Sequence, residues 1–159
     1  MSDAHQMFEE MGFDSSRAQI PDAVVYAIAR TFNLLSRELS TVYRRFSLSA
    51  PSFNLLMLLK HGKDAASFTQ QEVGRRLVVS PSDMTGLIDR LEHKGLVRRN
   101  PGRDRRCHLL AITQKGSRML DEVWPHHVEA IQLHVGSMTD GEAKVLLRVL
   151  AQIRVRLTG

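Results

Sequence analysis

The sequence of 159 residues is poor in cysteine and in aromatic residues, with a single cysteine, Cys107, and 6% aromatics. One cysteine cannot form an internal disulfide bond, which excludes a disulfide-stapled secreted scaffold and favours a cytoplasmic protein. The longest apolar run, Leu55–Leu59, is far too short to span a bilayer. The first residues, MSDAHQMFEE, lack the apolar core of a signal peptide. We therefore expect no association with a membrane.

The sequence also lacks the short motifs of common enzyme classes, such as a Gly-rich phosphate loop, H-E-x-x-H or G-x-S-x-G. Cys107 and His108 are adjacent in an expected strand, so their side chains point to opposite faces and cannot form a nucleophile–base pair. His126, His127 and His134 have near-helical spacing, but no cysteine or clear carboxylate accompanies them, and we expect surface histidines. The prediction is a protein that is not an enzyme, with no catalytic residue, metal or cofactor.

The positive charge of the chain is concentrated in one segment. The net charge is +5, and the segment 90–106 alone holds seven Lys/Arg against two Asp/Glu. The first 22 residues, in contrast, contain more Asp/Glu than Lys/Arg. With 43% hydrophobic and 25% charged residues, the composition is that of an ordinary globular domain. A local basic segment on such a domain favours binding of a polyanion at one place.

Apolar residues spaced three and four apart predict a mostly helical fold. A short helix is expected over 3–11, a long one over 21–46, a third after Ser49, and a sixth over 114–135 with Pro125 inside it. Capping signals at Thr69, Ser80 and Thr139 open three more helices. The apolar seams along 25–46 and 146–157 are longer than a small domain needs, which is typical of helices that pack against a partner chain.

Two short helices followed by a hairpin are typical of a winged helix. The second helix, from Pro81, buries one stripe and presents Ser82, Gly86 and Arg90 on the opposite face, which suits entry into a major groove. A turn at Pro101–Gly102 then joins two short extended runs, which places the following arginines at the tip of the wing.

The segment TQQEVGRRLVVSPSDMTGLIDRLEHKGLVRRNPGRDRRCHLLAITQKG resembles the MarR family of transcription regulators, and the helix order extends the resemblance over most of residues 21–157. It implies a homodimer that binds double-stranded DNA at a pseudo-palindrome. In the family's wing pair, matched by Asp104 and Arg106, the acid orients an arginine into the minor groove. Two departures are Val78, where the family often has glycine, and Gly86, where relatives often have arginine.

The expected arrangement is an α+β fold, mostly α, with a winged helix-turn-helix and a helical dimerisation region. We expect an N-terminal extension over 1–20, the winged helix over 49–113, and the dimerisation region over 21–48 and 114–159. The expected DNA contacts are Ser80, Pro81, Ser82, Thr85, Gly86, Arg90, Arg98, Arg103, Asp104, Arg105 and Arg106. The function predicted is a ligand-responsive regulator, most simply a repressor. The alternative is a winged helix that binds a protein instead of DNA, which a weak dependence of binding on salt would indicate.

Small aromatic or phenolic acids are common effectors in the family, and a crevice for one is expected between the dimer helices and the winged helix. The candidate lining residues are Tyr43, Phe46, Phe53, His61 and Trp124, for which core packing is the alternative. Cys107 is either a redox sensor activated by the neighbouring arginines or, as we expect, an inert strand thiol.

Overall fold

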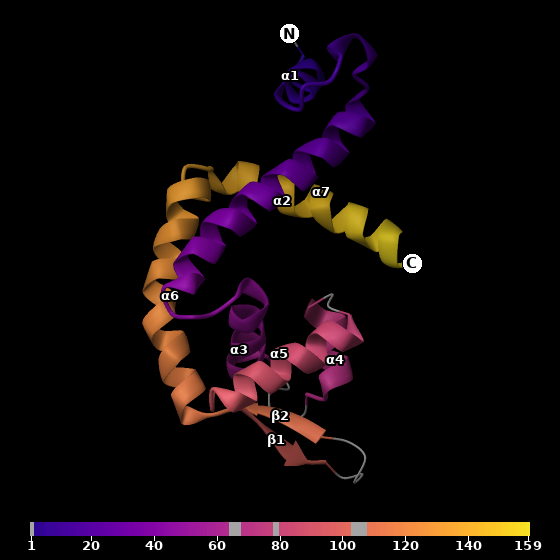
Figure 1. The fold of residues 1–159 in the computed structure, drawn as a ribbon. Coiled ribbons are helices and arrows are strands. Elements are labelled where there is room, and N and C mark those ends of the chain that lie inside the picture. Colours follow the sequence, from indigo (N-terminus) through magenta and orange to yellow (C-terminus); the bar gives the residue numbers. More distant parts are fainter. Residues whose placement is uncertain (1, 64–67, 78–79, 103–107) are drawn as a thin grey trace.

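The computed structural model describes residues 2–63, 68–77, 80–102 and 108–159. The helices are α1 (Asp3–Glu10), α2 (Ile20–Arg44), α3 (Ala50–His61), α4 (Gln70–Leu77), α5 (Pro81–His93), α6 (Gln114–Val135) and α7 (Asp140–Thr158), with a 3-10 turn at Ser15–Arg17. The strands β1 (Val97–Pro101) and β2 (His108–Ile112) form one antiparallel sheet (Figure 1). This order confirms the predicted mostly helical winged fold.

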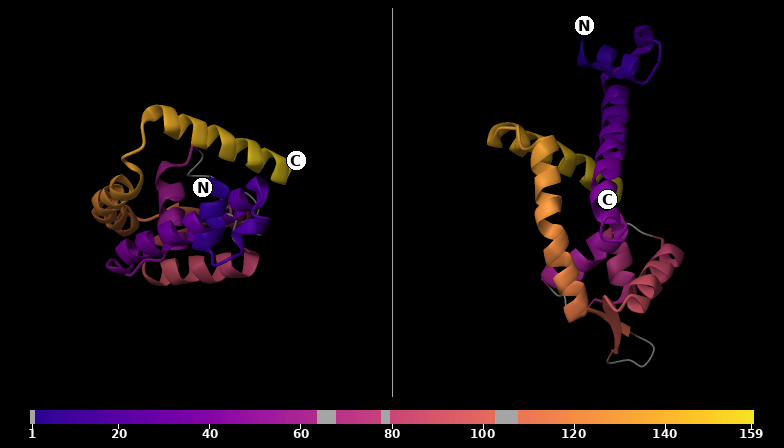
Figure 2. Two further views of the ribbon diagram at one scale, coloured as in Figure 1. Left: turned by 90° about the horizontal axis from the view of Figure 1, so that it is seen from above. Right: turned by 60° about the vertical axis from the view of Figure 1, so that its left-hand side comes forward.

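The winged helix and the long helices occupy different ends of the molecule. Helices α3, α4 and α5 and the hairpin form one body, from which α2 and α6 extend together in the same direction (Figures 1 and 2). Helix α7 turns back from the far end of α6, and α1 folds against the start of α2. Pro125 lies inside α6 without ending it. None of the described helices combines the length and apolarity needed to cross a bilayer.

The predicted capping signals begin the helices where expected. Ser49 and Ser80 each accept a hydrogen bond from a backbone N–H three residues later, at the start of α3 and α5. Thr113, which was not predicted as a cap, does the same at the start of α6. At α7, Thr139 Oγ1 accepts from the N–H of Glu142 (3.3 Å), and the Glu142 carboxylate accepts from the N–H of Thr139 (2.8 Å). These bonds satisfy N–H groups that a helix leaves unpaired in its first turn.

The main core lies inside the winged helix. The predicted stripe of α5 is at most 2% exposed at Met84, Leu87, Ile88 and Leu91, and it packs with buried residues of α3 and the hairpin. The lower half of α6 closes this core with Leu120 and Val123. The core therefore fixes the orientation of α5, whose other face is exposed.

Strand β1 extends further than the sequence predicts, into the expected turn at Pro101–Gly102. Pro101 pairs with His108 at the end of a register that begins at Val97↔Ile112, so Pro101 belongs to strand β1 and not to a turn as predicted. A two-stranded sheet tolerates proline here because its fixed φ suits an extended strand and an edge position does not require its N–H. The N–H of Leu110 also donates to Phe68 O (2.8 Å), which attaches the hairpin to the segment before α4.

A close contact joins the hairpin to α6. Thr113 Oγ1 donates to Gly95 O (2.7 Å), and a Cβ on Gly116 would lie 2.1 Å from Leu96 O. Any side chain at residue 116 would therefore force the two segments apart. This contact explains why residue 116 is a glycine.

Helices α2 and α7 leave apolar side chains exposed. Helix α2 buries only Ala23 and Tyr43, and its seam residues Val25, Ile28 and Phe32 are 65%, 39% and 68% exposed. No residue of α7, all of which the structure describes, is buried. One chain alone thus leaves uncovered the N-terminal half of the α2 seam and most of the α7 seam, whereas Leu39, Val42 and Phe46 at the other end of the α2 seam pack against the core.

Candidate nucleic-acid interface

The start of α5 is held by a small hydroxyl and carboxylate network. Ser80 Oγ accepts from the N–H of Asp83 (3.2 Å) and donates to Asp83 Oδ2 (2.6 Å), and it lies 3.1 Å from Ser82 Oγ. Ser80 and Ser82 are exposed, as expected for residues that meet DNA. Their first role is to fix the N-terminal turn of the helix, whose N–H groups also favour a phosphate.

Helix α4 orients another predicted DNA contact. Gln70 Nε2 donates to Thr85 Oγ1 (2.6 Å), which links the first turn of α4 to the exposed face of α5. The two helices therefore present Thr85 in a defined orientation. Gln70 lies on the helix before the predicted recognition helix, and the sequence pattern alone did not identify this contact.

Gly86 leaves space for the side chain of Arg90. A Cβ built on Gly86 would lie 3.2 Å from Arg90 Nη1, so the guanidinium group rests close to the glycine. Arg90 is exposed on the same side of α5, one helical turn further on. The glycine that departs from the family pattern thus determines where this arginine can lie.

Arg99 connects the hairpin to α5. Its guanidinium donates from Nη2 to Asp89 Oδ1 (2.6 Å) and from Nη1 to Glu92 Oε2, and its backbone N–H donates to Glu92 Oε1 (3.2 Å). These contacts raise the pKa of Arg99, chiefly through the hydrogen bond to Asp89. From the sequence, Arg99 was only one of the positive charges of the basic segment. Its ion pairs were not predicted, because Glu92 and Asp89 lie seven and ten residues away and form no local pattern with it.

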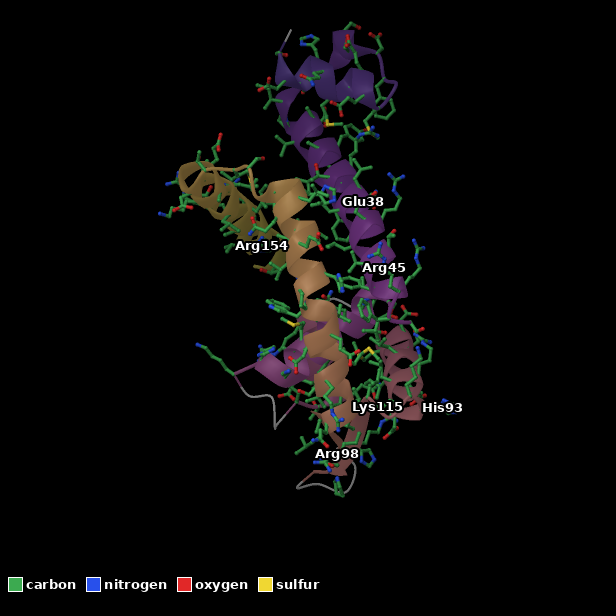
Figure 3. All side chains as sticks on the ribbon, turned by 90° about the vertical axis from the view of Figure 1, so that its left-hand side faces the viewer. Glu38, Arg45, His93, Arg98, Lys115 and Arg154 are labelled. Atoms are coloured by element: carbon green, nitrogen blue, oxygen red, sulfur yellow. The ribbon has the colours of Figure 1, made fainter. Side chains whose placement is uncertain are left out.

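Other cations at this end of the molecule bind carbonyl groups. Lys94 Nζ donates to Ser47 O (2.6 Å), and Lys115 Nζ donates to Lys94 O (2.8 Å). Arg98, next to Arg99 on β1, is exposed, and Figure 3 shows it at the hairpin end with His93 and Lys115. Arg98 is therefore better placed than Arg99 for a phosphate.

Several predicted site residues lie outside the described part of the chain. These are Arg103, Asp104, Arg105 and Arg106 of the wing, together with Cys107 and Val78. The backbone of Pro81 begins α5, as predicted.

The candidate effector residues divide into two groups, the first of which is an aromatic cluster. Tyr43 and Phe53 are each 2% exposed and stack with ring centroids 4.5 Å apart. The Tyr43 hydroxyl lies 2.9 Å from Nδ1 of His127, and burial raises the pKa of Tyr43 to about 12. Burial also lowers the pKa of His127. The expectation of a surface histidine was wrong for His127, because α6 orients its ring toward Tyr43 of α2 and Phe53 of α3.

The second group lies at an open hollow between α3 and α6. His61 and Trp124 line it with Met57, Leu120 and Asp121, and its volume is about 360 Å³. Trp124 is 44% exposed and also approaches the His127 ring, at 5.4 Å between centroids. Phe46 lies apart, half-buried beside His126. The prediction that Tyr43 and Phe53 line a crevice was wrong, because both are buried in the main core and neither lines this hollow. His61 and Trp124 line the hollow and are accessible.

The sequence and the fold agree on one family. The model of the MarR family matches residues 46–106, which include α3, α4, α5 and strand β1. The chain belongs to the MarR family. Its fold matches that of Sco3205 from Streptomyces coelicolor, a MarR family transcriptional regulator solved in complex with DNA, with a TM-score of 0.80 and 22% identity over 87% of this chain and 88% of that one.

Two further relatives bear on function. The HTH-type transcriptional regulator PecS of Dickeya dadantii is 27% identical over 138 residues, or 86% of this chain and 83% of PecS. CouR from Rhodococcus jostii RHA1, solved bound to p-coumaroyl-CoA, has a TM-score of 0.74 and 24% identity over 85% of this chain and 94% of its own. These MarR family comparisons confirm the predicted function class, a DNA-binding transcription regulator.

Proposed function

We propose that two copies of this MarR family protein bind a pseudo-palindromic duplex, with α5 of each copy in a major groove, and that the bound dimer represses transcription. The observation that carries this proposal is the geometry of α5: one face is anchored in the core, and the opposite face exposes Ser82, Thr85 and Arg90. Short hydroxyl side chains near the helix start suit base edges, and an arginine further along suits a base or a phosphate.

The distribution of buried and exposed apolar side chains suggests which residues bind DNA and which form the dimer. Residues 49–113 contain most of the core that orients α5, and we assign them to DNA binding. Residues 21–48 and 114–159 carry the uncovered apolar faces of α2 and α7, and we assign them to dimerisation. Two recognition helices related by a two-fold axis then meet half-sites one helical turn apart.

The wing supplies phosphate and minor-groove contacts in this proposal. Arg98 is exposed on β1, and the predicted tip residues Arg103, Asp104, Arg105 and Arg106 follow it in the sequence. Phosphate contacts release counterions, so affinity must fall steeply with salt.

Fluorescence anisotropy with a selected duplex tests the assignment. We expect Arg90→Ala to weaken binding by about 1–3 kcal/mol, as loss of a base contact would. Arg98→Ala should weaken binding more uniformly and lower the slope of log affinity against log salt by about one. Arg154→Ala, on α7 and far from the hairpin in Figure 3, is the matched control and should bind as the wild type does. Equal losses in all three variants would refute the placement of DNA at α5.

We assign effector binding to the hollow beside His61 and Trp124, with a small aromatic acid or its thioester as ligand. The hollow is open and partly apolar, and it lies where the dimer helix α6 meets helix α3 of the winged helix. A ligand there contacts both regions, so it can bias their relative positions and hence DNA affinity.

Trp124 gives a direct test, because it is the only tryptophan. We expect p-coumaroyl-CoA or p-coumaric acid to change its fluorescence saturably and to release DNA. His61→Ala should weaken this response, whereas His134→Ala, on an exposed part of α6, should not. A saturable response unaffected by His61→Ala would place the ligand elsewhere.

A further inference from the structure

Helix α7 carries apolar side chains on two opposite sides. One side is the predicted stripe: Leu146, Val149, Leu150, Ile153 and Leu157. Val155 is 69% exposed and lies about 200° around the helix from Ile153. A helix with one apolar stripe needs one neighbour to cover it, and a helix with two such sides needs two.

The second side of α7 is shaped as a groove. A shallow hollow of about 460 Å³ is lined, among the residues that the structure describes, by Arg148, Ala151, Gln152, Val155 and Arg156 of this helix. We call it the α7 groove. The small side chain of Ala151 lies between longer neighbours, so a side chain from another helix can enter there. After Glu142 the sequence of α7 contains basic but no acidic residues, so this end of the helix is positive.

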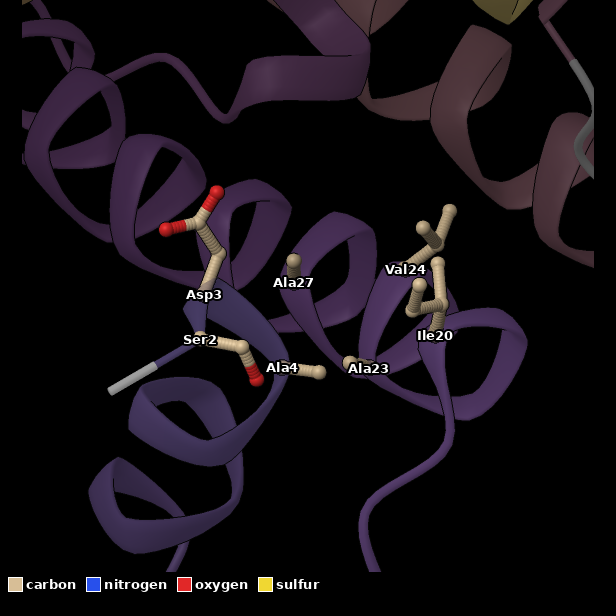
Figure 4. A pocket seen from close by; sticks show the side chains of 7 residues that line it. All are labelled: Ser2, Asp3, Ala4, Ile20, Ala23, Val24 and Ala27. Atoms are coloured by element: carbon tan, nitrogen blue, oxygen red, sulfur yellow. The ribbon is translucent and has the colours of Figure 1, made fainter.

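A second apolar hollow lies between α1 and the start of α2. It has a volume of about 350 Å³ and is lined by Ser2, Asp3, Ala4, Ile20, Ala23, Val24 and Ala27 (Figure 4). We call it the α1–α2 hollow. Ile20 is 73% exposed and Val24 41%. Figure 4 shows the Asp3 carboxylate on one side of the hollow and Ile20 and Val24 on the other.

Helix α1 is held firmly enough to form this hollow. Phe8 meets Tyr26 of α2 edge to face, with ring centroids 5.7 Å apart, and Phe8 is 8% exposed. Glu10 pairs with Arg30 at 3.5 Å. These contacts make a small core of their own, separate from the core of the winged helix.

We propose that the α1–α2 hollow of one protomer receives the C-terminal half of α7 from its partner, so that α1 clamps the dimer. The inference rests on the homodimer proposed above and extends its interface to the N-terminal segment. Val155 fits the alanine-lined floor of the hollow, and Ile20 fits the α7 groove. The basic rim of Arg148 and Arg156 meets the acidic segment that contains Asp3.

The occupant must come from a second copy. Within the described part of one chain, α7 makes no extensive contact with α1 or α2, so it does not close the α1–α2 hollow of its own protomer. The hollow is continuous with the exposed apolar face of α2, which the dimer must cover. A two-fold axis makes the contact twice, once for each α7.

Cross-linking in full-length protein tests the contact. In a Cys107→Ser background we would combine Ala27→Cys with Val155→Cys and treat the protein with a short bismaleimide. A covalent dimer is expected on a denaturing gel. The matched control combines Ala27→Cys with Arg154→Cys, one position further around α7, and should cross-link at least tenfold less. Equal yields in the two would overturn the proposal.

Sedimentation equilibrium separates this inference from the dimer itself. Val155→Asp places a carboxylate on an exposed position and should raise the dimer dissociation constant at least tenfold. Ser137→Asp, at an exposed position in the connection before α7, should leave it within twofold. A wild-type dimer unaffected by Val155→Asp would overturn the clamp and leave the dimer standing. A wild type that stays monomeric at all concentrations, with and without operator DNA, would overturn both.

Discussion

Replacing Arg99 with alanine is expected to loosen the wing from α5. The Arg99 side chain is 24% exposed, and its partners Asp89 and Glu92 are 57% and 39% exposed. Pairs this accessible contribute about 0.2–1 kcal/mol each. Two pairs that share one guanidinium, together with the buried stem of the side chain, predict a loss of about 1–2 kcal/mol in the free energy of unfolding.

The same change should weaken DNA binding more than it weakens the fold. Without Arg99, two carboxylates remain uncompensated next to the face of α5 that approaches phosphates, and the hairpin loses its attachment to that helix. We expect at least a tenfold loss of affinity, because like charges across an interface are strongly unfavourable.

Urea unfolding and anisotropy on the same preparations check both effects. Arg98→Ala is the control on the neighbouring residue, and it should change the unfolding free energy by less than about 0.5 kcal/mol, as a substitution of an exposed residue does. If Arg99→Ala were as stable as Arg98→Ala and bound DNA as tightly as the wild type, the proposed attachment of the wing to α5 would be refuted.

Three other substitutions follow from single contacts. Gly116→Ala should lower stability by about 1–3 kcal/mol in urea unfolding, because the new Cβ would meet Leu96 O; wild-type stability would contradict this. Gly86→Ala should add about 0.5–1 kcal/mol of helix stability but displace Arg90 and weaken DNA binding, and unchanged affinity would count against that arginine's role. Burial lowers the pKa of His127 below the ordinary histidine value of about 6.5, so the unfolded chain takes up a proton first and stability falls as the pH drops below that value. His127→Phe should reduce this fall between pH 7.5 and 5.5, and an unaltered pH dependence would exclude His127 as its source.

Sequence periodicity and capping signals were sufficient for most of the fold. Most of the fold follows from local patterns that the structure contains. These are the buried stripe from Met84 to Leu91, the caps at Ser80 and Thr139, and the junction from Thr113 to Gly116. The strand through Pro101 was missed because proline–glycine pairs favour turns in general, while the pairing with His108 depends on a distant segment.

The site was less predictable wherever a contact joins residues far apart in the chain. Arg99 with Asp89, Lys94 with Ser47, and Tyr43 with His127 each depend on how separate helices and strands come together. The spacing of apolar residues three and four apart showed that α5 has one buried and one exposed face. It could not show that Arg90 rests by Gly86 or that Gln70 holds Thr85.

Selection of binding sequences from a random pool of duplexes tests the central claim most directly. The account predicts a two-fold-symmetric sequence with half-site centres about 10–10.5 base pairs apart, bound by two protomers with an affinity that falls steeply with salt. If no duplex is enriched over random DNA at moderate salt, the claim that α5 reads an operator is contradicted, and a protein-binding winged helix becomes the better account.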